Sequence, residues 1–220
     1  VDAGSDNNYP IYRACFNGNV NNVRMLLKDK NVNPSCANDQ CIRTAAHGKN
    51  ETIVKLLLSD SRVNPCACKN EALIKASEYG RDGIVKLLLL EYDVDPDIKD
   101  YDVGNTSLIV ASRQGHSDIV ELLLELDANP NKKTTIEGDT PLIEALEEGY
   151  SDIVKLLLEN GADPTIRNNK GISAYDLALN NRHIETARLI IEYMDLQRAQ
   201  QNLAFMKYFL DRDDLDDNLD

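Results

Sequence analysis

The chain has 220 residues, of which 42% are hydrophobic, and this is enough apolar material for a sizeable buried core. Aromatic residues make up 5% and tryptophan is absent, which disfavours a large cofactor pocket. The formal net charge of -13 disfavours nucleic acid and anionic membrane surfaces, because binding to both depends on Lys and Arg. We therefore expect a folded protein with no cofactor, no nucleic-acid partner and no membrane partner.

The chain contains no apolar run long enough for a membrane span. The longest run, 84–90, is interrupted by Lys86 and is much shorter than the roughly 18 residues that a transmembrane helix needs. Five cysteines form a sparse and odd-numbered set, which favours a reducing compartment. The predicted location is therefore intracellular, in the cytoplasm or alternatively in the nucleus.

A six-residue phrase recurs along the chain and predicts a repeat protein. I-V-K-L-L-L stands at 53–58, 84–89 and 153–158, with I-V-E-L-L-L at 119–124 and weaker copies at 22–27 and 186–191. The second residue of these copies falls at positions 23, 54, 85, 120, 154 and 187, so the period is about 33 residues. Nine residues before each of these positions stands an alanine: Ala14, Ala45, Ala76, Ala111, Ala145 and Ala178.

Each repeat is predicted to hold two short helices around a turn. Between the alanine and the six-residue phrase most repeats carry a glycine, as at Gly115, and Thr140-Pro141 has the residue types of a helix cap and first helical position. Lys49 stands where the other repeats place this glycine, so we expect a strained left-handed backbone there. The predicted core includes Leu56, Leu57, Leu87, Leu88, Leu122, Leu123, Leu156 and Leu157.

These motifs resemble the ankyrin-repeat consensus. The resemblance rests on Thr140-Pro141-Leu142, the alanine row, Gly115-His116, the recurring phrase and 161–164 (G-A-D-P), and it covers residues 1 to about 194. It implies an all-α ankyrin-repeat solenoid of six helix-turn-helix repeats whose extended concave surface holds another protein. The short early fingers, which are the loops joining successive repeats, are similar to those of ankyrin arrays of protists and large DNA viruses.

The expected organisation in chain order follows from this repeat. We expect an array cut from a longer protein, because the chain starts inside a finger. After 194 a helix with apolar residues at three- and four-residue steps is predicted to cap the array, with a partner-binding helix as the alternative. The predicted segments are a remnant finger 1–8, repeats 9–37, 38–67, 68–98, 99–132, 133–166 and 167–194, a capping helix 195–210 and an acidic disordered tail 211–220.

Two groups of residues are candidate metal ligands. Cys36, Cys41, Cys66 and Cys68 lie in fingers that stacking would bring within about 10 Å of each other, but buried, unreactive cysteines are favoured over a zinc site or disulfide. The run D-x-D-x-D at 93–97 is typical of the start of a calcium loop. Ile98 then replaces the required glycine, so an acidic finger tip is favoured over a calcium site.

No catalytic group is predicted. The histidines His47, His116 and His183 lie far apart in the sequence, and no nucleophile with a base, phosphate-binding glycine loop or metalloprotease motif is present. The leading hypothesis is a non-catalytic, monomeric interaction scaffold. Its alternatives are the targeting domain of an enzyme whose catalytic domain lies outside this fragment, and a metal-responsive scaffold.

The predicted partner-binding surface comes from the resemblance, which implies that positions two and three after each alanine point toward the concave face. These positions vary between repeats, as expected of a surface that carries specificity, although exposed positions also drift freely. Tyr79 and Arg113 occupy equivalent positions and should lie side by side. Acidic residues follow, including Asp100, Asp102 and Glu137, and favour a partner with a basic segment. The predicted site is Phe16, Glu78, Tyr79, Tyr101, Arg113, Gln114, Glu147 and Glu148.

Overall fold

The computed structural model describes residues 8–180 and 184–216, and beyond Ala204 it describes only the backbone of the last helix. This part of the chain contains no strand, and Arg167 and Ser173 form one isolated bridge. The helices are α1 Tyr9–Phe16, α2 Val20–Leu26, α3 Cys36–His47, α4 Glu51–Leu58, α5 Ala67–Glu78, α6 Asp82–Tyr92, α7 Ser107–Gln114, α8 Ser117–Glu125, α9 Pro141–Glu148, α10 Ser151–Glu159, α11 Ala174–Asn180 and α12 Ile184–Asp216.

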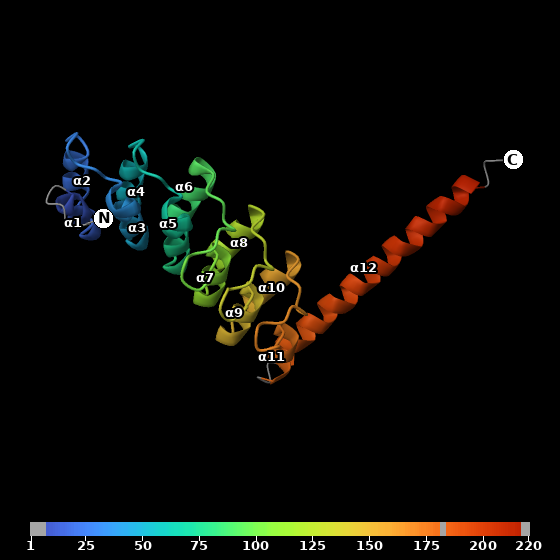
Figure 1. The fold of residues 1–220 in the computed structure, drawn as a ribbon. Coiled ribbons are helices and arrows are strands. Elements are labelled where there is room, and N and C mark those ends of the chain that lie inside the picture. Colours follow the sequence, from blue (N-terminus) through green and yellow to red (C-terminus); the bar gives the residue numbers. More distant parts are fainter. Residues whose placement is uncertain (1–7, 181–183, 217–220) are drawn as a thin grey trace.

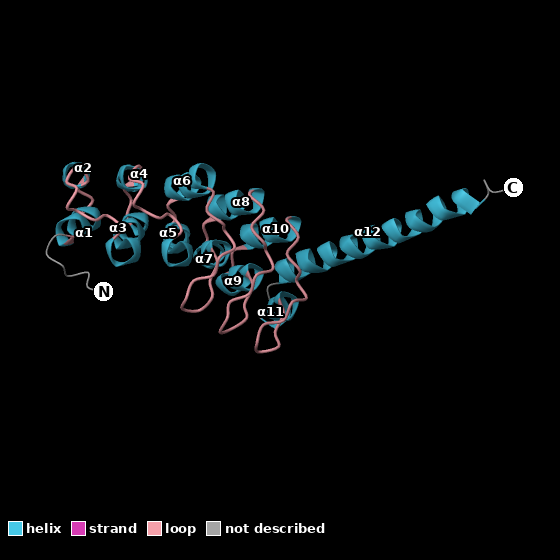
Figure 2. Cartoon of the chain, turned by 45° about the horizontal axis from the view of Figure 1, so that its top comes forward, coloured by secondary structure: helices cyan, strands magenta, loops and turns pink. Residues whose placement is uncertain are grey.

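The helices form six antiparallel pairs that stack in chain order, as the repeat predicted (Figure 1). Figure 2 shows two rows: α1, α3, α5, α7, α9 and α11 form one layer, and α2, α4, α6, α8 and α10 form the other. The all-α solenoid of helix-turn-helix repeats is therefore confirmed. The two helices of each pair pack against each other and against the neighbouring pairs, so the core is one continuous cluster along the array.

The alanine row lies at the centre of this core. All six alanines are at most 5% exposed, because a small side chain lets the paired helices approach closely. Of the predicted core leucines, Leu57, Leu87, Leu88, Leu123 and Leu157 are buried. Leu56, Leu122 and Leu156 are only partly buried, because they lie at the edge of the second helix row.

The turns between paired helices follow the glycine prediction except at Lys49. Gly18, Gly80, Gly115 and Gly149 all have positive φ, between 65° and 80°, which glycine adopts at little cost. Lys49 is not among the residues with positive φ, so the expectation of a strained backbone there is wrong. The preceding Gly48 is extended, with φ -67° and ψ 179°, and this changes the path of the turn.

The two short fingers enter their repeats through left-handed turns. Residues 37–39 and 68–70 have φ between 50° and 59°, and Asp and Asn tolerate this region better than most residues. The turns are held by bonds to the next finger: Asp39 Oδ1 accepts a hydrogen bond from the N–H of Asn64 at 3.1 Å, and Asn70 Nδ2 donates to the carbonyl of Asp95 at 2.6 Å. Asp39 and Asn70 therefore connect successive repeats.

The later fingers are longer and join each other through their backbones. The N–H of Thr135 donates to the carbonyl of Val103 at 2.7 Å, and the N–H of Asn169 donates to the carbonyl of Glu137 at 2.8 Å. Gly104, at φ 76°, lies so close to Thr135 that an added Cβ would be 2.7 Å from the Thr135 nitrogen. This close approach aligns the finger tips of repeats 4 and 5.

The last helix differs from the predicted cap. α12 begins as the second helix of repeat 6, continues to Asp216 and projects away from the stacked repeats (Figure 1). Residues 195–210 therefore do not fold over the end of the array, and 211–216 are helical rather than disordered. The reason is that 184–216 contains neither Gly nor Pro to end the helix. Of the other terminal predictions, residues 1–7 of the remnant finger and 217–220 of the tail lie outside the described residues.

Candidate partner-binding groove

Two adjoining hollows lie along the first-helix row and form what we call the inner groove. The first, of about 230 Å³, is lined mainly by α1, α3 and α5, and the second, of about 340 Å³, by α5, α7 and the finger at 100–105. Glu71 and Lys75 line both hollows. The inner groove therefore runs continuously across repeats 1 to 4.

Aromatic rings dominate the first hollow. Tyr9, Tyr12 and Phe16 follow one another along α1, with the ring centroids of Tyr12 and Phe16 6.3 Å apart. Tyr79 meets His47 edge-on at 4.2 Å between centroids. Phe16 is 64% and Tyr79 40% exposed, and accessible aromatic side chains beside a hollow are suited to bind a partner.

The second hollow mixes apolar and charged side chains, and among the charged ones carboxylates outnumber cations. One carboxylate, Glu78, pairs with Lys75 at 2.8 Å. Glu78, Asp100, Tyr101 and Asp102 line it together with Arg113. Tyr101 is 71% exposed, and the Lys69 ammonium lies 4.4 Å from its ring centroid in a cation–π contact. The hollow thus combines an accessible ring with several carboxylates.

Arg113 is held in place by the next repeat. Its Nε donates to Glu144 Oε2 at 2.7 Å, its Nη2 donates to Glu144 Oε1, and Nη2 also donates to Asn105 Oδ1 at 3.1 Å. The bond to Glu144 raises the pKa of Arg113. The structure thus places Arg113 against Glu144 in the second hollow and Tyr79 against His47 in the first. Arg113 therefore links repeats 4 and 5, and its guanidinium is already engaged in the absence of a partner.

The far end of the first-helix row is acidic, as the sequence indicates. Glu147 and Glu148 are exposed at the end of α9, and Gln114 is exposed at the end of α7. Partial burial raises the pKa of Glu147, and the nearby Asp139 and Glu144 raise it further. A cationic side chain near Glu147 would relieve this repulsion.

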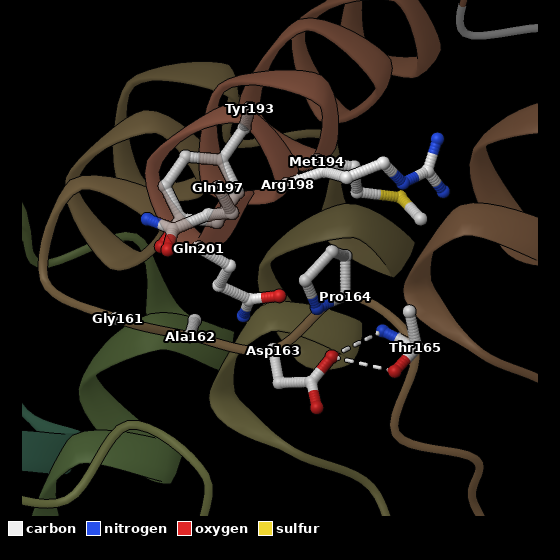
Figure 3. Close-up of a pocket in the computed structure, with 10 residues that line it drawn as sticks. All are labelled: Gly161, Ala162, Asp163, Pro164, Thr165, Tyr193, Met194, Gln197, Arg198 and Gln201. Atoms are coloured by element: carbon white, nitrogen blue, oxygen red, sulfur yellow. Dashed lines mark hydrogen bonds between the residues drawn. The ribbon is translucent and has the colours of Figure 1, made fainter. Parts of the chain in front are cut away.

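A further hollow of about 410 Å³ lies where α12 passes the finger at 161–165 (Figure 3). Tyr193, Met194 and Gln197 face the finger, and within it Asp163 Oδ1 accepts hydrogen bonds from the N–H and the hydroxyl of Thr165 at 2.8 and 2.6 Å. Gln197, Arg198 and Gln201 of α12 supply the other polar groups that line this hollow, whereas Asp163 Oδ1 closes its own turn.

The four cysteines that were candidate metal ligands do not form a metal site in the described residues. Cys41 is buried, Cys36 and Cys68 are half-buried and Cys66 is exposed, and all are free thiols. Burial, together with the neighbouring Cys41, raises the pKa of Cys36 to about 11, so this thiol is unreactive. Within the described ranges, no three His, Cys, Asp or Glu side chains are placed to share a metal ion.

The acidic run at 93–102 stabilises its own finger. Asp100 Oδ1 accepts hydrogen bonds from the N–H groups of Val103, Gly104 and Asn105 at 2.7–3.1 Å, and Asp97 Oδ1 accepts one from the N–H of Asn129 at 3.0 Å. These oxygens are therefore directed at backbone N–H groups rather than arranged around a cation. The arrangement favours the acidic finger tip over the calcium loop.

Sequence reasoning missed three contributors to the groove. Tyr12 was recognisable from the spacing of Tyr9, Tyr12 and Phe16, which places three rings on one face of a helix. Glu71 and Glu144 gave no such signal, because each is one of many glutamates until the neighbouring repeat brings an arginine to it. Arg43 pairs with Glu71 as Arg113 pairs with Glu144.

Comparison with known families agrees with this architecture. A model described as three copies of the ankyrin repeat matches residues 11–100, 42–134, 73–168 and 108–203. The chain therefore belongs to the ankyrin-repeat family. Repeats of this family are generally protein–protein interaction modules, and the fold is typically non-catalytic. A search of curated proteins finds no match.

The length and composition of the described helices show whether any of them could cross a membrane. None of them combines the length and the apolar composition needed to cross a bilayer. This holds for α12 as well, the longest helix, which carries charged residues along its course.

Proposed function

We propose that this chain is a non-catalytic interaction scaffold that holds a segment of another protein in the inner groove. The observation that carries the proposal is the joining of the two hollows through Glu71 and Lys75, with the exposed rings of Phe16, Tyr79 and Tyr101 along them. Exposed aromatic anchors beside a hollow are the usual centre of a protein interface. The scaffold acts inside the cell, since its five cysteines are all free thiols, as is usual in a reducing compartment.

The partner segment carries an apolar side chain and a basic one. The apolar side chain enters the ring-lined first hollow, where Phe16 and Tyr79 lose water on contact. The basic side chain lies toward Glu78 and Asp102, and Glu147 and Glu148 extend the acidic surface beyond. Complementary charge of this kind sets orientation and association rate more than affinity, so binding weakens with added salt.

The test uses a partner recovered by pull-down from the native cell, with its affinity measured by calorimetry. Phe16→Ala and Tyr79→Ala should each weaken binding by about 1–3 kcal/mol. Phe16→Ala should leave the melting temperature nearly unchanged because Phe16 is 64% exposed, whereas Tyr79→Ala should lower it slightly because Tyr79 is 40% exposed and contacts His47. Lys155→Ala is the control, because Lys155 lies in the second-helix row and only its ion pair with Glu159 is lost. Full affinity in both ring variants would show that the partner binds elsewhere.

A further inference from the structure

The part of α12 beyond the last repeat has an unusual position. Residues 184–194 complete repeat 6, the helix passes the finger at 161–165 as far as Gln201, and the remainder projects into solvent (Figure 1). A helix of about 15 residues is marginal in water by itself, and most helices in proteins are stabilised by packing an apolar face. We therefore expect the segment 202–216 to be stabilised by packing against another helix.

Its sequence has the spacing of a coiled-coil seam. In the heptad notation abcdefg, the leucines occupy position a, and Ala199 and Met206 occupy position d. Leu196 and Leu203 are each 56% exposed. Apolar residues thus alternate at steps of three and four along one stripe, which we call the α12 stripe: Leu196, Ala199, Leu203, Met206 and Leu210. A seven-residue period keeps such a stripe facing a second helix.

We propose that the α12 stripe pairs with the same stripe of a second copy of this chain, as an antiparallel two-stranded coiled coil. In this pairing Leu196 lies opposite Met206 of the second copy, and Ala199 lies opposite Leu203. These layers combine a large residue with a smaller or more flexible one, which favours close packing. The last stripe residue, Leu210, lies opposite Glu192, so the apolar contact is confined to 196–206. The two-fold axis passes near Gln201, so the two arrays lie at opposite ends of the pair.

The residues that flank the stripe favour the same chain as the partner. Positions e and g near the two-fold axis are Gln200 and Asn202, which are uncharged, and each amide meets its own copy as both donor and acceptor. Farther out, Arg188 at position g, whose guanidinium also lies 3.9 Å from Glu185 of its own helix, is opposite Asp216, also at g, of the second copy. Self-pairing in this direction therefore brings opposite charges together.

The parallel arrangement is disfavoured by charge. It would place Asp213, Asp214 and Asp216 of one copy beside the same residues of the other, and like charges at close range repel. In the antiparallel pair these aspartates lie instead near the start of the other copy's α12. That region adjoins the uncovered end of the array, where Leu179, Ile184 and Ile191 are exposed around a hollow of about 480 Å³.

This inference does not rest on the inner groove, and it departs from the expectation of a monomer. The test is sedimentation equilibrium of the full chain from about 10 to 500 µM, a range suited to an interface smaller than about 1,000 Å². The mass should rise from that of one chain, 24.6 kDa, toward twice that value. A constant monomer mass over the whole range overturns the proposal.

Matched variants locate the interface. Leu203→Asp puts a charge in the centre of the stripe and should raise the dimer Kd at least about thirtyfold. Ala204→Asp introduces the same charge one position away, on the outside of the pair, and should change Kd by less than about threefold. Circular dichroism verifies that both variants keep their helices. If Leu203→Asp dimerises as well as Ala204→Asp, the chain associates through another surface and the proposal is wrong.

The charge at 216 separates the two orientations. In the antiparallel pair Asp216→Arg sets two arginines against each other and should raise Kd about fivefold, and adding Arg188→Asp should restore it. In a parallel pair Asp216→Arg removes aspartate repulsion and lowers Kd. A lower Kd for Asp216→Arg therefore contradicts the antiparallel arrangement.

Discussion

Arg113 in α7 and Glu144 in α9 form a two-pronged ion pair across the boundary between repeats 4 and 5. The Glu144 side chain is only 7% exposed, so its charge depends on this arginine for compensation. The pair also shows how a side chain that varies between repeats can belong to the scaffold.

Arg113→Ala should therefore lower the free energy of unfolding by about 2–4 kcal/mol, because it leaves the Glu144 carboxylate buried without a partner. Urea denaturation provides the measurement. Adding Glu144→Ala to Arg113→Ala should recover part of the loss. A loss below about 0.5 kcal/mol for Arg113→Ala alone would mean that water reaches Glu144 and replaces the arginine.

Asp39→Asn should stabilise the protein by about 0.5 kcal/mol at pH 7. Burial raises the pKa of Asp39 above its ordinary value of 3.8, despite the opposing effects of the Asn64 N–H and Arg43. Ionisation of Asp39 in the folded state therefore reduces stability above pH 3.8, and this penalty disappears as the pH falls below both values. Asparagine keeps the acceptor for the Asn64 N–H without the charge. In the next repeat the equivalent position is an asparagine, Asn70, which instead donates to the carbonyl of Asp95.

The measurement for Asp39→Asn is thermal unfolding from pH 3 to pH 7. The stabilisation should shrink toward zero at the acid end. A gain that is the same at both ends of the range would show that it does not come from the charge of Asp39. Asp60→Asn provides the contrast: the hydrogen bond from Arg62 lowers the pKa of Asp60, so this variant should lose stability at pH 7.

Lys49→Gly should destabilise the protein by about 0.5–1 kcal/mol. Lys49 does not have positive φ, so glycine relieves no strain in the folded state and only increases the freedom of the unfolded chain. Lys49→Ala is the control and should change the melting temperature little. A higher melting temperature for Lys49→Gly would indicate a left-handed turn at this position after all.

Leu123→Ala and Leu122→Ala form a matched pair in α8. Leu123 is completely buried, so its truncation should cost about 2–5 kcal/mol of unfolding free energy. Leu122 is only partly buried, so its truncation should cost about 1–2 kcal/mol. Chemical denaturation of the two variants compares them directly, and equal losses would contradict the difference in burial.

Gly104→Ala should destabilise the array more than Gly161→Ala. Both glycines have positive φ, so both alanines carry the cost of a left-handed backbone, about 1 kcal/mol. At Gly104 the added Cβ also meets the backbone of Thr135, whereas at Gly161 nothing lies within 4 Å. Melting temperatures measure the difference. Equal values would show that the fingers of repeats 4 and 5 separate without cost.

Much of the fold could be predicted from residue patterns because the repeat unit is local. The buried alanine row and the glycine turns each depend on residues close in sequence, and stacking of like units follows from their exposed apolar faces. Lys49 was misjudged because the extended Gly48 before it changes the turn. The direction of α12 was also misjudged. A stripe of leucines predicts that a helix packs, but it does not say against what.

The sequence by itself determined the ankyrin-repeat solenoid, because the period of about 33 residues and the helix-turn signals act within single repeats. Only the tertiary structure decided which side chains remain accessible to a partner. Arg113 stands two residues after the row alanine of its repeat and Tyr79 stands three after that of the preceding repeat, yet Arg113 is bound by Glu144 and Tyr79 is partly exposed beside Phe16 and His47. That difference depends on residues of the neighbouring repeat, about 30 positions away in sequence. A pattern confined to one repeat does not include them.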